Sequence, residues 1–356
     1  MGLVDYAFRR LTGRVASLRE VASRIETIAP EEGTDRPPAR MLPGMLERAL
    51  ATDPLITLES QLTAARGGPS VHQATVAYHL RDAEIVPDGF VCRGYRQRLR
   101  GGSTVRTVWE HRDVPPIHLE EGALVSSFQG LRWFGDWLLA DNGQALLAER
   151  EGMPALALPA SAHWPHAAEY EVLLDVPRRV VRKAQVQHLV VFDDIGQNAS
   201  RRARAAELRR RARAAVEGRS TGHAVFILRR DHGADRRLVN EDEVAGWADR
   251  RGFEVVDPMD LSAEGTVRAL RDARLVVGVE GSNMLHALLA MDLGGAFVAI
   301  VTPHRFVVGS KDYADALGVR YGLMVGHAEP GGSFRVDLDE LGRTIDLAER
   351  GQAVAS

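Results

Sequence analysis

Residues 274–300 read RLVVGVEGSNMLHALLAMDLGGAFVAI, and this stretch decides the fold. An apolar run over 275–279 ends at the turn EGSN, a helix-like run MLHALLAM follows, and a second apolar run begins at 296. Short apolar runs bounded by turn residues are typical of buried strands. The stretch therefore predicts a strand, a turn, a helix and a second strand, with Glu280 and His286 on either side of the turn.

The alternation of strand-like and helix-like runs continues on both sides of this stretch. In chain order, the predicted elements lie at 223–230, 241–252, 253–258, 262–273, 274–279, 282–292 and 296–301. Strands that alternate with helices through short connections form parallel sheets with right-handed crossovers. Residues 220–330 therefore predict a Rossmann-like domain, and residues 331–356 predict a final helix and tail.

The chain has 356 residues, which is too many for one ordinary core, so we expect two domains. In the N-terminal half, β-branched and aromatic residues predict several strands between 70 and 128, among them 103–111. Apolar residues at helical spacing predict a helix over 131–152. The predicted parts ahead of the Rossmann-like domain are a helical arm and loop at 1–50, an α/β domain at 51–198 and an interdomain helix at 199–219.

Composition excludes several classes of protein. A hydrophobic content of 45% and a charged content of 26% are typical of a globular domain, and a net charge of −3 gives no field to recruit nucleic acid or anionic lipid. Cys92 is the only cysteine, so the chain has no internal disulfide and no Cys-based zinc site. Because the sequence has no run of 18 apolar residues and no signal-peptide pattern, we expect a cytoplasmic protein.

Two basic segments each allow two interpretations. Residues 7–26 predict a basic amphipathic helix, either a solvated surface helix or a peripheral contact with a membrane. The Ala/Arg run at 199–219 is a strong helix former and has enough arginine to raise nucleic-acid binding as a possibility. It contains no aromatic residue to stack on bases, so we expect a solvated interdomain helix and no nucleic-acid partner.

Four arginines follow the first predicted strand of the Rossmann-like domain: Arg229, Arg230, Arg236 and Arg237. Ligands of open α/β sheets bind outside the carboxyl ends of the strands. Guanidinium groups bind oxyanions bidentately, so this loop predicts an anionic ligand, most simply a diphosphate. The alternative is an exposed loop with scattered charge.

The turn at the end of the strand 274–279 is a second candidate. Gly281 lets the backbone approach a ligand closely, and Ser282 or Asn283 either faces an anion at the helix start or serves as the helix N-cap. A carboxylate repels a phosphate, so Glu280 is interpreted as binding sugar hydroxyls or acting as a base. His286 is either a structural helix residue or part of the site.

Other motifs are weaker or missing. The sequence has no G-x-G-x-x-G after a strand, no P-loop, no G-x-S-x-G and no H-E-x-x-H. A third strand end, at 302–305, is a weaker candidate of the same type as the first two. The pair Asp193 and Asp194 either holds a metal, with no identifiable third ligand, or caps the Arg-rich helix.

Several of these segments together resemble one known family. The segments are RRD at 229–231, RRLVNEDEV at 236–244, GFEVVDP at 252–258 and GVEGSNMLH at 278–286. Their order resembles glycosyltransferase family 61, the capsular-polysaccharide-biosynthesis (DUF563) group, over residues 223–325. In the N-terminal half, FGDWLLAD at 134–141 is similar to the family's Y/F-x-H-W-L-x-D segment.

The resemblance implies an α/β fold of GT-B type, in which two Rossmann-type domains face each other across a cleft. Residues 51–198 would form the acceptor side, and residues 220–330 would bind the donor. It also implies an inverting glycosyltransferase that needs no cofactor and no essential metal. The donor would be a nucleotide-diphosphate sugar, and the acceptor a glycan or small molecule in polysaccharide or glycoconjugate biosynthesis.

The resemblance also implies roles for individual residues. Arg229 and Arg230 would hold the diphosphate, Asn240 and Glu241 would brace their loop, and Gly281 would allow close backbone approach. The full set of implied donor-binding residues is Arg229, Arg230, Arg237, Asn240, Glu241, Gly281, Ser282, Asn283 and His286.

The sequence departs from the family pattern at two histidines. The family's turn histidine is Glu280 here, and its N-terminal histidine is Asp136. An inverting transfer needs one general base, for which Asp136 is the first candidate, Asp141 the second and Glu280 the third. The departures also allow an alternative, a catalytically degenerate glycosyltransferase-fold subunit that binds without turnover. The sugar, the nucleotide base and the oligomeric state stay open.

Overall fold

The computed structural model describes residues 16–100, 113–159, 164–217, 222–230, 232 and 236–350. It is a mixed α/β structure that divides into two compact units. Unit 1 comprises Met1–Glu32 and His72–Arg204, and unit 2 comprises Gly33–Val71 and Ala205–Ser356. Residues 33–71 thus belong with the C-terminal half of the chain, a division that differs from the predicted boundaries at 50 and 198.

Unit 2 is built on a five-stranded sheet in which every strand pairing is parallel. Its strands are β11 (Ala224–Ile227), β12 (Phe253–Val256), β13 (Leu275–Val279), β14 (Ala296–Val301) and β15 (Arg320–Val325). All residues of β11, β13 and β14 are buried. Helices cover both faces of such sheets, so the strands read as continuous apolar runs, and the four strands predicted from those runs are confirmed.

The order of these strands is β12-β11-β13-β14-β15. Strand β12 therefore lies on one side of β11, and β13 lies on the other side. Between β11 and β13 lies the topological switch point, where open α/β sheets bind their ligands.

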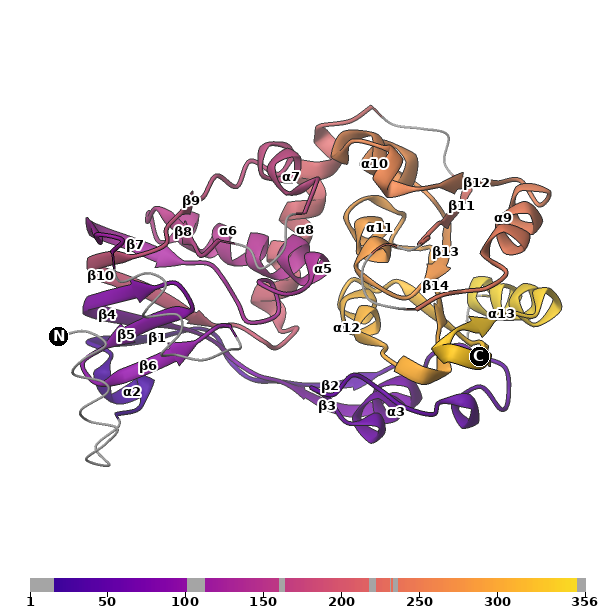
Figure 1. The fold of residues 1–356 in the computed structure, drawn as a ribbon, viewed down its shortest axis with the longest axis horizontal. Helices are drawn as coiled ribbons and strands as arrows, with labels where there is room; N and C mark the ends of the chain where they lie inside the picture. The colour runs from indigo at the N-terminus through magenta and orange to yellow at the C-terminus, as the bar shows by residue number, and fades with distance from the viewer. Residues whose placement is uncertain are drawn as a thin grey trace, which may run out of the picture. The chain divides into compact units, whose positions relative to one another are not determined.

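Helices lie on both faces of the sheet of unit 2. They are α9 (Glu241–Asp249), α10 (Ala263–Leu270), α11 (Leu285–Ala290), α12 (Gly309–Ala316) and α13 (Leu338–Glu349). Helices α9 and α13 cover one face, and α10, α11 and α12 cover the other (Figure 1). The predicted Rossmann-like alternation is confirmed, although the sequence did not predict α12 and β15.

The rest of unit 2 consists of short elements. They are α3 (Leu58–Arg66), β16 (His327–Ala328), β17 (Phe334–Arg335) and the 3₁₀ turns η1 (Leu46–Arg48), η3 (Pro258–Asp260), η4 (Ser282–Met284), η5 (Pro303–Arg305) and η6 (Pro330–Gly332). Strands β2 (Glu32–Arg36) and β3 (Gly68–His72) form a separate two-stranded sheet.

Unit 1 contains an eight-stranded mixed sheet with the order β6-β5-β4-β10-β7-β8-β9, and β1 also pairs with β4. Its strands are β1 (Arg24–Ala29), β4 (Thr75–Val86), β5 (Gly89–Cys92), β6 (Tyr95–Arg98), β7 (Ile117–Leu124), β8 (Ala155–Ala157), β9 (Arg179–Val180) and β10 (Ala184–Asp193). The pairings among β10, β7, β8 and β9 are parallel, and the others are antiparallel.

The sheet of unit 1 is thus only partly of the predicted Rossmann type. The turn Pro87-Asp88 reverses the chain, and β5, which begins at Gly89, and β6 then extend the sheet as antiparallel strands. Gly89 has φ +152°, and a Cβ there would lie 2.0 Å from the Gln97 carbonyl oxygen. A glycine at this position allows the sharp reversal that ends the parallel pattern.

The prediction of a helix over 7–26 is wrong for residues 16–26, the part of this range that the structure describes. Residues Leu18–Val21 form only one turn, α2, with a capping box between Ser17 and Glu20. The chain becomes extended at Ala22 and enters β1, because Ile25 and Thr27 are β-branched and favour a strand. The strand predicted at 103–111 lies outside the described residues.

The helix predicted over 131–152 is confirmed, with one interruption. It consists of α5 (Phe134–Asp136), a π-helical turn η2 (Trp137–Asp141) and α6 (Asn142–Arg150). All five residues of the π-helical turn are buried. π-Helical turns are rare and often occur at functional sites, and this one contains the candidate base Asp141. A further helix, α7 (Ala167–Leu173), was not predicted.

The Ala/Arg run forms the predicted helix, α8 (Ala199–Ala214), but the expectation that it is a solvated helix is wrong for three of its arginines. Arg201, Arg204 and Arg209 are 6–7% exposed. Arg204 forms a bidentate ion pair with Asp194 (2.7 and 2.8 Å), and Arg209 donates to the Leu288 and Met291 carbonyls. Guanidinium groups can be buried when their donors meet carboxylates and carbonyls in this way.

The Asp194 carboxylate is therefore paired with the guanidinium group of Arg204. It also accepts a hydrogen bond from Thr75 at 2.9 Å. Burial by itself raises the pKa of Asp194, but Arg204, Arg201 and Thr75 outweigh burial and lower the pKa below its usual value. The start of α8 is capped by Asn198 and Glu32 rather than by the Asp193–Asp194 pair. Among the described residues, no helix is long and apolar enough to cross a membrane.

Candidate functional site

Two of the four arginines that the sequence predicted to bind an anion, Arg229 and Arg236, lie close together at the switch point of unit 2. Arg229 follows β11 and is 7% exposed, and its Nη1 lies 3.4 Å from Oδ1 of Asn283 in the turn after β13. A Cβ on Gly281 would lie 2.3 Å from Nη1 of Arg229 and 3.3 Å from Nη1 of Arg236. Gly281 is thus the position whose missing side chain leaves room for both guanidinium groups.

Glu241 fixes the loop that carries Arg229. Its carboxylate accepts hydrogen bonds from the backbone N–H groups of Arg229 (2.7 Å) and Arg230 (2.9 Å). Arg230 adopts the left-handed conformation with φ +52°. Its side chain then forms an exposed ion pair with Asp242. The structure therefore gives Glu241 the bracing position expected from the resemblance, whereas Arg230 is turned away from Arg229 toward solvent.

Asn240 has a different partner from the one expected. Its Nδ2 donates to the Val336 carbonyl at 2.9 Å, and its Oδ1 accepts from the Val336 N–H at 3.1 Å. These paired bonds tie the start of α9 to the segment before α13, rather than to the loop of Arg229. Asn240 is consequently a structural link within unit 2.

The second inward arginine is Arg236, whereas the sequence singled out Arg237. The backbone pairs as an isolated bridge between Leu238 and Phe334, and Leu238 is buried. Alternate residues of an extended segment point to the same side, so Arg236 shares the inner side with Leu238 and Arg237 is exposed. The apolar Leu238 was the signal in the sequence that could have distinguished the two arginines.

Arg236 is incompletely satisfied. Its Nη1 donates to the Glu280 carbonyl, and its buried Nε has no hydrogen-bond partner among the described residues. Burial lowers the pKa of Arg236 to about 10, an effect that Arg229 and Arg305 reinforce and that Glu280 and Asp53 oppose. Arg236 still carries its charge at neutral pH and has a free donor, which suits an anionic ligand.

The Glu280 carboxylate is not directed at a ligand. Glu280 is 5% exposed, and its two carboxylate oxygens accept hydrogen bonds from the N–H and hydroxyl of Ser310 at the start of α12. Burial raises its pKa, while Arg236, the Ser310 hydrogen bonds and Arg229 act in the opposite direction. The structure thus makes Glu280 a positioning residue that holds Arg236 by charge and by its carbonyl, not a group that binds sugar hydroxyls.

The rest of the turn is partly exposed. Gly281, Ser282 and Asn283 all have intermediate exposure, and neither Ser282 nor Asn283 acts as a side-chain N-cap of the helical turn η4. Asn283 instead lies between the two strand ends, since its Nδ2 donates to the Leu228 carbonyl and its Oδ1 accepts from Arg229. His286 is 3% exposed inside α11, so it lies in the core of unit 2 rather than on the ligand side.

The third candidate strand end, after β14, adds Arg305 to the charged groups at this edge of the sheet. Arg305, in the turn after β14, forms an ion pair with Asp53 at 2.5 Å, and both belong to unit 2. The Nε2 of His304 and the Oγ1 of Thr302 are buried without hydrogen-bond partners among the described residues. Polar groups at the ends of β11, β13 and β14 therefore gather at one edge of the parallel sheet.

Unit 1 contains a separate cluster around Asp141, in the π-helical turn. The carboxylate is 1% exposed and accepts a hydrogen bond from the Ser127 N–H at 3.1 Å. It packs against Gly130, where a Cβ would lie 2.2 Å from Oδ2. Burial raises the pKa of Asp141 to about 7, although Ser127 and Arg178 act in the opposite direction.

Asp136 lies one turn before Asp141 and has intermediate exposure. The two carboxylates interact, because the charge of Asp136 contributes to the raised pKa of Asp141. Phe134, two residues before Asp136, and Trp137, directly after it, belong to an aromatic cluster with Trp164 and Tyr170, with ring centroids 5.6–6.1 Å apart. A partly exposed carboxylate is a suitable place for an acceptor hydroxyl.

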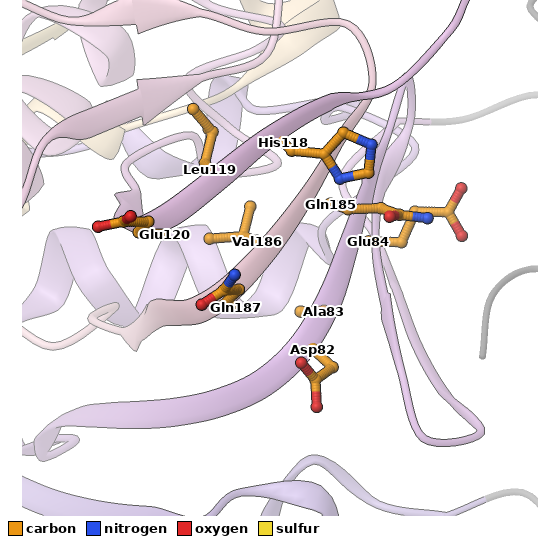
Figure 2. Close-up of a pocket in the computed structure, with 9 residues that line it drawn as sticks. All are labelled: Asp82, Ala83, Glu84, His118, Leu119, Glu120, Gln185, Val186 and Gln187. Atoms are coloured by element: carbon orange, nitrogen blue, oxygen red, sulfur yellow. The ribbon is translucent and has the colours of Figure 1, made fainter.

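A cavity of about 560 Å³ lies over the sheet of unit 1, on strands β4, β7 and β10 (Figure 2). Its lining residues are Asp82, Ala83, Glu84, His118, Leu119, Glu120, Gln185, Val186 and Gln187. None of the predicted site residues belongs to this lining. Its three carboxylates would repel a diphosphate, so we do not assign the donor to this cavity.

Comparison with known families decides the class of the protein. A model of the family described as Glycosyltransferase 61 matches residues 111–296, just over half of the chain. The chain belongs to this family. No match is found among curated proteins.

The match includes both clusters of the glycosyltransferase, Asp136 and Asp141 in unit 1 and Arg229, Arg236 and Glu280 in unit 2. The resemblance seen in the sequence is thereby confirmed, and membership indicates that the chain is a glycosyltransferase.

Proposed function

We propose that this glycosyltransferase moves a sugar, with inversion, from a nucleotide-diphosphate sugar to a hydroxyl of a glycan or small-molecule acceptor in polysaccharide or glycoconjugate biosynthesis. The observation that carries the proposal is the arginine pair, Arg229 and Arg236, whose guanidinium groups pack against Gly281. This pair lies at the switch point, where α/β sheets bind nucleotides.

In this proposal, the arginine pair holds the donor diphosphate. Arg229 is fixed by Asn283, and Arg236 by the Glu280 carbonyl, so both cations are in place before the ligand arrives. When the bond from the anomeric carbon to the diphosphate oxygen breaks, negative charge develops on that oxygen. Preorganised donors in a partly buried site stabilise such charge more strongly than solvent does.

Asp136 is the proposed general base. The acceptor oxygen forms a bond to the anomeric carbon on the face opposite the diphosphate, and its proton passes to the Asp136 carboxylate. The nucleoside diphosphate departs with the electron pair of the broken bond, so the anomeric configuration is inverted. Asp141 is too deeply buried to meet the acceptor and serves to position Asp136 and adjust its charge.

Several finer features are part of the same proposal; the first two rest on the family resemblance, and the others rest on composition and on the basic segments of the sequence. They are a GT-B arrangement with a cleft between two domains, transfer without an essential metal or cofactor, no nucleic-acid partner, a cytoplasmic location and peripheral association with a membrane. Guanidinium groups at the diphosphate would take the charge-neutralising role that a metal ion has elsewhere, which supports transfer without metal.

The test is a thermal-shift screen of the chain with UDP, GDP, CDP, dTDP, ADP and their sugars, with and without EDTA. A ligand that binds only the folded state raises the apparent stability by mass action. We expect one nucleotide base to give a shift that EDTA does not remove, followed by transfer of the matching sugar to an acceptor. Binding without turnover over a broad acceptor panel would instead support the degenerate subunit, and no shift with any nucleotide would contradict the donor site.

A further inference from the structure

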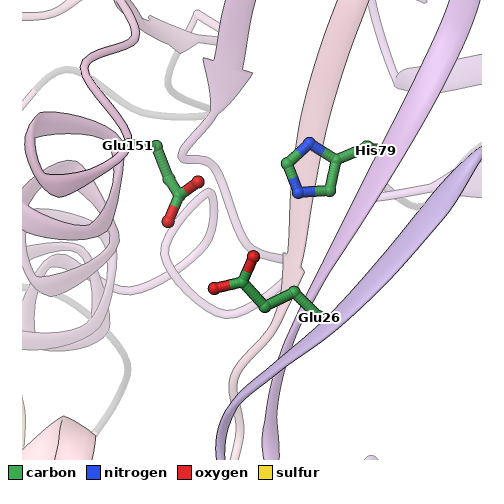
Figure 3. Close-up of side chains that lie close together, drawn as sticks. All are labelled: Glu26, His79 and Glu151. Atoms are coloured by element: carbon green, nitrogen blue, oxygen red, sulfur yellow. The ribbon is translucent and has the colours of Figure 1, made fainter.

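Unit 1 contains three neighbouring side chains of types that can bind a metal ion, and the proposed transfer reaction does not use them. They are Glu26 on β1, His79 on β4 and Glu151 directly after α6 (Figure 3). One ligand atom from each residue lies within 4.8 Å of the other two. The three residues come from distant parts of the sequence, so no local sequence motif brings them together.

The imidazole of His79 is oriented as a metal-binding histidine would be. His79 is 4% exposed, and its Nε2 is buried with no hydrogen-bond partner among the described residues. Figure 3 shows this nitrogen on the side of the ring that faces the two carboxylates. An unpaired buried nitrogen costs free energy, so an occupant that satisfies it would be stabilising.

The other ring nitrogen of His79 has a partner that sets the tautomer. Nδ1 lies 3.0 Å from Nε2 of His188 on the neighbouring strand β10, and the two rings stack. When Nδ1–H donates to His188, the lone pair of His79 Nε2 points at the carboxylates. Metal-ligating histidines commonly have such an orienting hydrogen bond on the second nitrogen.

The charges around the group favour the metal-binding form. Burial lowers the pKa of His79, Arg24 and His188 lower it further, and Glu151 and Glu26 oppose the shift. A metal ligand must be the neutral imidazole, and the lowered pKa acts in that direction. Arg24 forms an ion pair with Glu26, and Arg150 lies 3.9 Å from the same carboxylate. The two arginine side chains are 63% and 57% exposed, so solvent screens both charges, and a metal ion would displace Arg24 from Glu26.

The geometry points to a structural site for a divalent transition-metal ion, with Zn²⁺ the best match, held by Glu26, His79 and Glu151. One nitrogen and two carboxylate ligands suit Zn²⁺, whereas Mg²⁺ and Ca²⁺ prefer all-oxygen sites. In a tetrahedral site with bonds of about 2.1 Å, two ligand atoms lie about 3.4 Å apart, so the ligand atoms, now within 4.8 Å of one another, need to approach by up to about 1.4 Å.

The ion would link β1, β4 and the end of α6. Asp141 lies directly before the start of α6, about 15 Å from Glu151 along the helix at 1.5 Å per residue. The site is therefore separate from the proposed chemistry, and a metal-free transfer reaction is compatible with it. Its effect would be to fix the helix that begins next to Asp141.

The test uses the full chain, stripped with a chelator and titrated with Zn²⁺ by calorimetry, with Co²⁺ absorption as a second readout of nitrogen and oxygen ligation. Glu151→Gln removes one ligand and retains the side-chain shape, and Glu149→Gln removes the same charge from an exposed position of the same helix. His188→Phe keeps the stacked ring and removes the acceptor for Nδ1.

We expect one Zn²⁺ per chain, a loss of affinity of at least about tenfold in Glu151→Gln, and a loss of about 10- to 100-fold in His188→Phe. Glu149→Gln should bind as the unchanged chain does, and Mg²⁺ should give no response. Thermal unfolding of the stripped chains shows whether Glu151→Gln is folded. Equal Zn²⁺ affinity in Glu151→Gln and Glu149→Gln, or no Zn²⁺ bound by the unchanged chain, would overturn the assignment.

Discussion

Each unit buries arginine, but the two surroundings differ. In unit 1, Arg204 meets the Asp194 carboxylate through two hydrogen bonds, and Thr75 completes the group. In unit 2, Arg236 donates to a carbonyl oxygen and has no hydrogen bond to a carboxylate among the described residues, with the positive charge of Arg229 nearby. The difference shows that burial of a charged residue does not by itself mark a ligand site. A guanidinium that lacks a directly bonded carboxylate is the better sign.

Unit 1 also contains an intermediate case. The Asp141 carboxylate is fully buried and accepts a hydrogen bond from Ser127, yet its pKa is raised to about 7 because these contacts do not offset burial. Asp194 is similarly buried but its pKa is lowered, since Arg204 supplies the opposite charge. Incompletely compensated groups thus occur in both units, and in each they lie beside a candidate functional residue.

Replacing Asp194 by Asn should give the largest effect on stability. Arg204 would remain buried without its counter-ion, so we expect the free energy of unfolding to fall by about 3–5 kcal/mol. Denaturant unfolding measures the change. Asp193→Asn removes the same charge from an exposed neighbouring position and should change stability by less than about 0.5 kcal/mol. Similar losses in both variants would mean that the ion pair is not what stabilises this region.

Replacing Asp136 by Asn should give a comparable effect on catalysis. The variant cannot accept the proton of the acceptor hydroxyl, so kcat should fall by about 10²- to 10⁴-fold, with little change in donor affinity. Steady-state kinetics with the cognate donor measures both quantities, and Asp193→Asn again serves as the charge-matched control. A kcat near that of the unchanged enzyme would show that Asp136 is not the general base.

The raised pKa of Asp141 predicts a pH effect on stability. The folded state binds the proton of Asp141 up to about pH 7, whereas the unfolded chain loses it near pH 4. The stabilisation that Asp141 contributes to the folded state is therefore fully present below about pH 4. It is lost as the pH rises from about 4 to 7, which lowers the free energy of unfolding by at most about 4 kcal/mol. The free energy of unfolding of Asp141→Asn should lack this decline over the same range. An identical pH dependence in both proteins would contradict the shift.

Much of the fold of unit 2 could be predicted from the sequence. Strands such as LVVGV at β13 and AFVAIV at β14 are buried on both faces, and continuous apolar runs between glycine-containing turns identify them. The strand end at Gly281 could also be identified, because a turn rich in small polar residues follows a buried run. The strand order could not, since it depends on which strands pair and not on their composition.

Residues whose exposure depends on distant contacts could not be assigned from the sequence. Arg236 and Arg237 are adjacent and identical. The apolar Leu238 indicates which of them points inward only once the segment is known to be extended, and its pairing with Phe334 establishes that. Glu280 was expected to face ligand, but Ser310, 30 residues later, takes its carboxylate. The π-helical turn at Asp141 was also unexpected, because its apolar residues have ordinary helical spacing.

The smallest expected effect concerns the arginine pair directly. Arg236→Ala should weaken binding of the cognate nucleoside diphosphate by about 10- to 100-fold, the loss expected for a charge-assisted hydrogen bond worth about 1.5–3 kcal/mol. Arg237→Ala removes the same charge from an exposed neighbouring position and should bind normally. Calorimetric titration measures both affinities.

The most direct test of the central claim compares the nucleoside diphosphate with the nucleoside monophosphate of the same base. If the arginine pair holds the diphosphate, the unchanged chain and Arg237→Ala should both bind the diphosphate at least about tenfold more tightly than the monophosphate. In Arg236→Ala, this preference should largely disappear. A preference that is retained in Arg236→Ala, or that Arg237→Ala abolishes to the same extent, would contradict the assignment of the donor site to Arg229, Arg236 and Gly281.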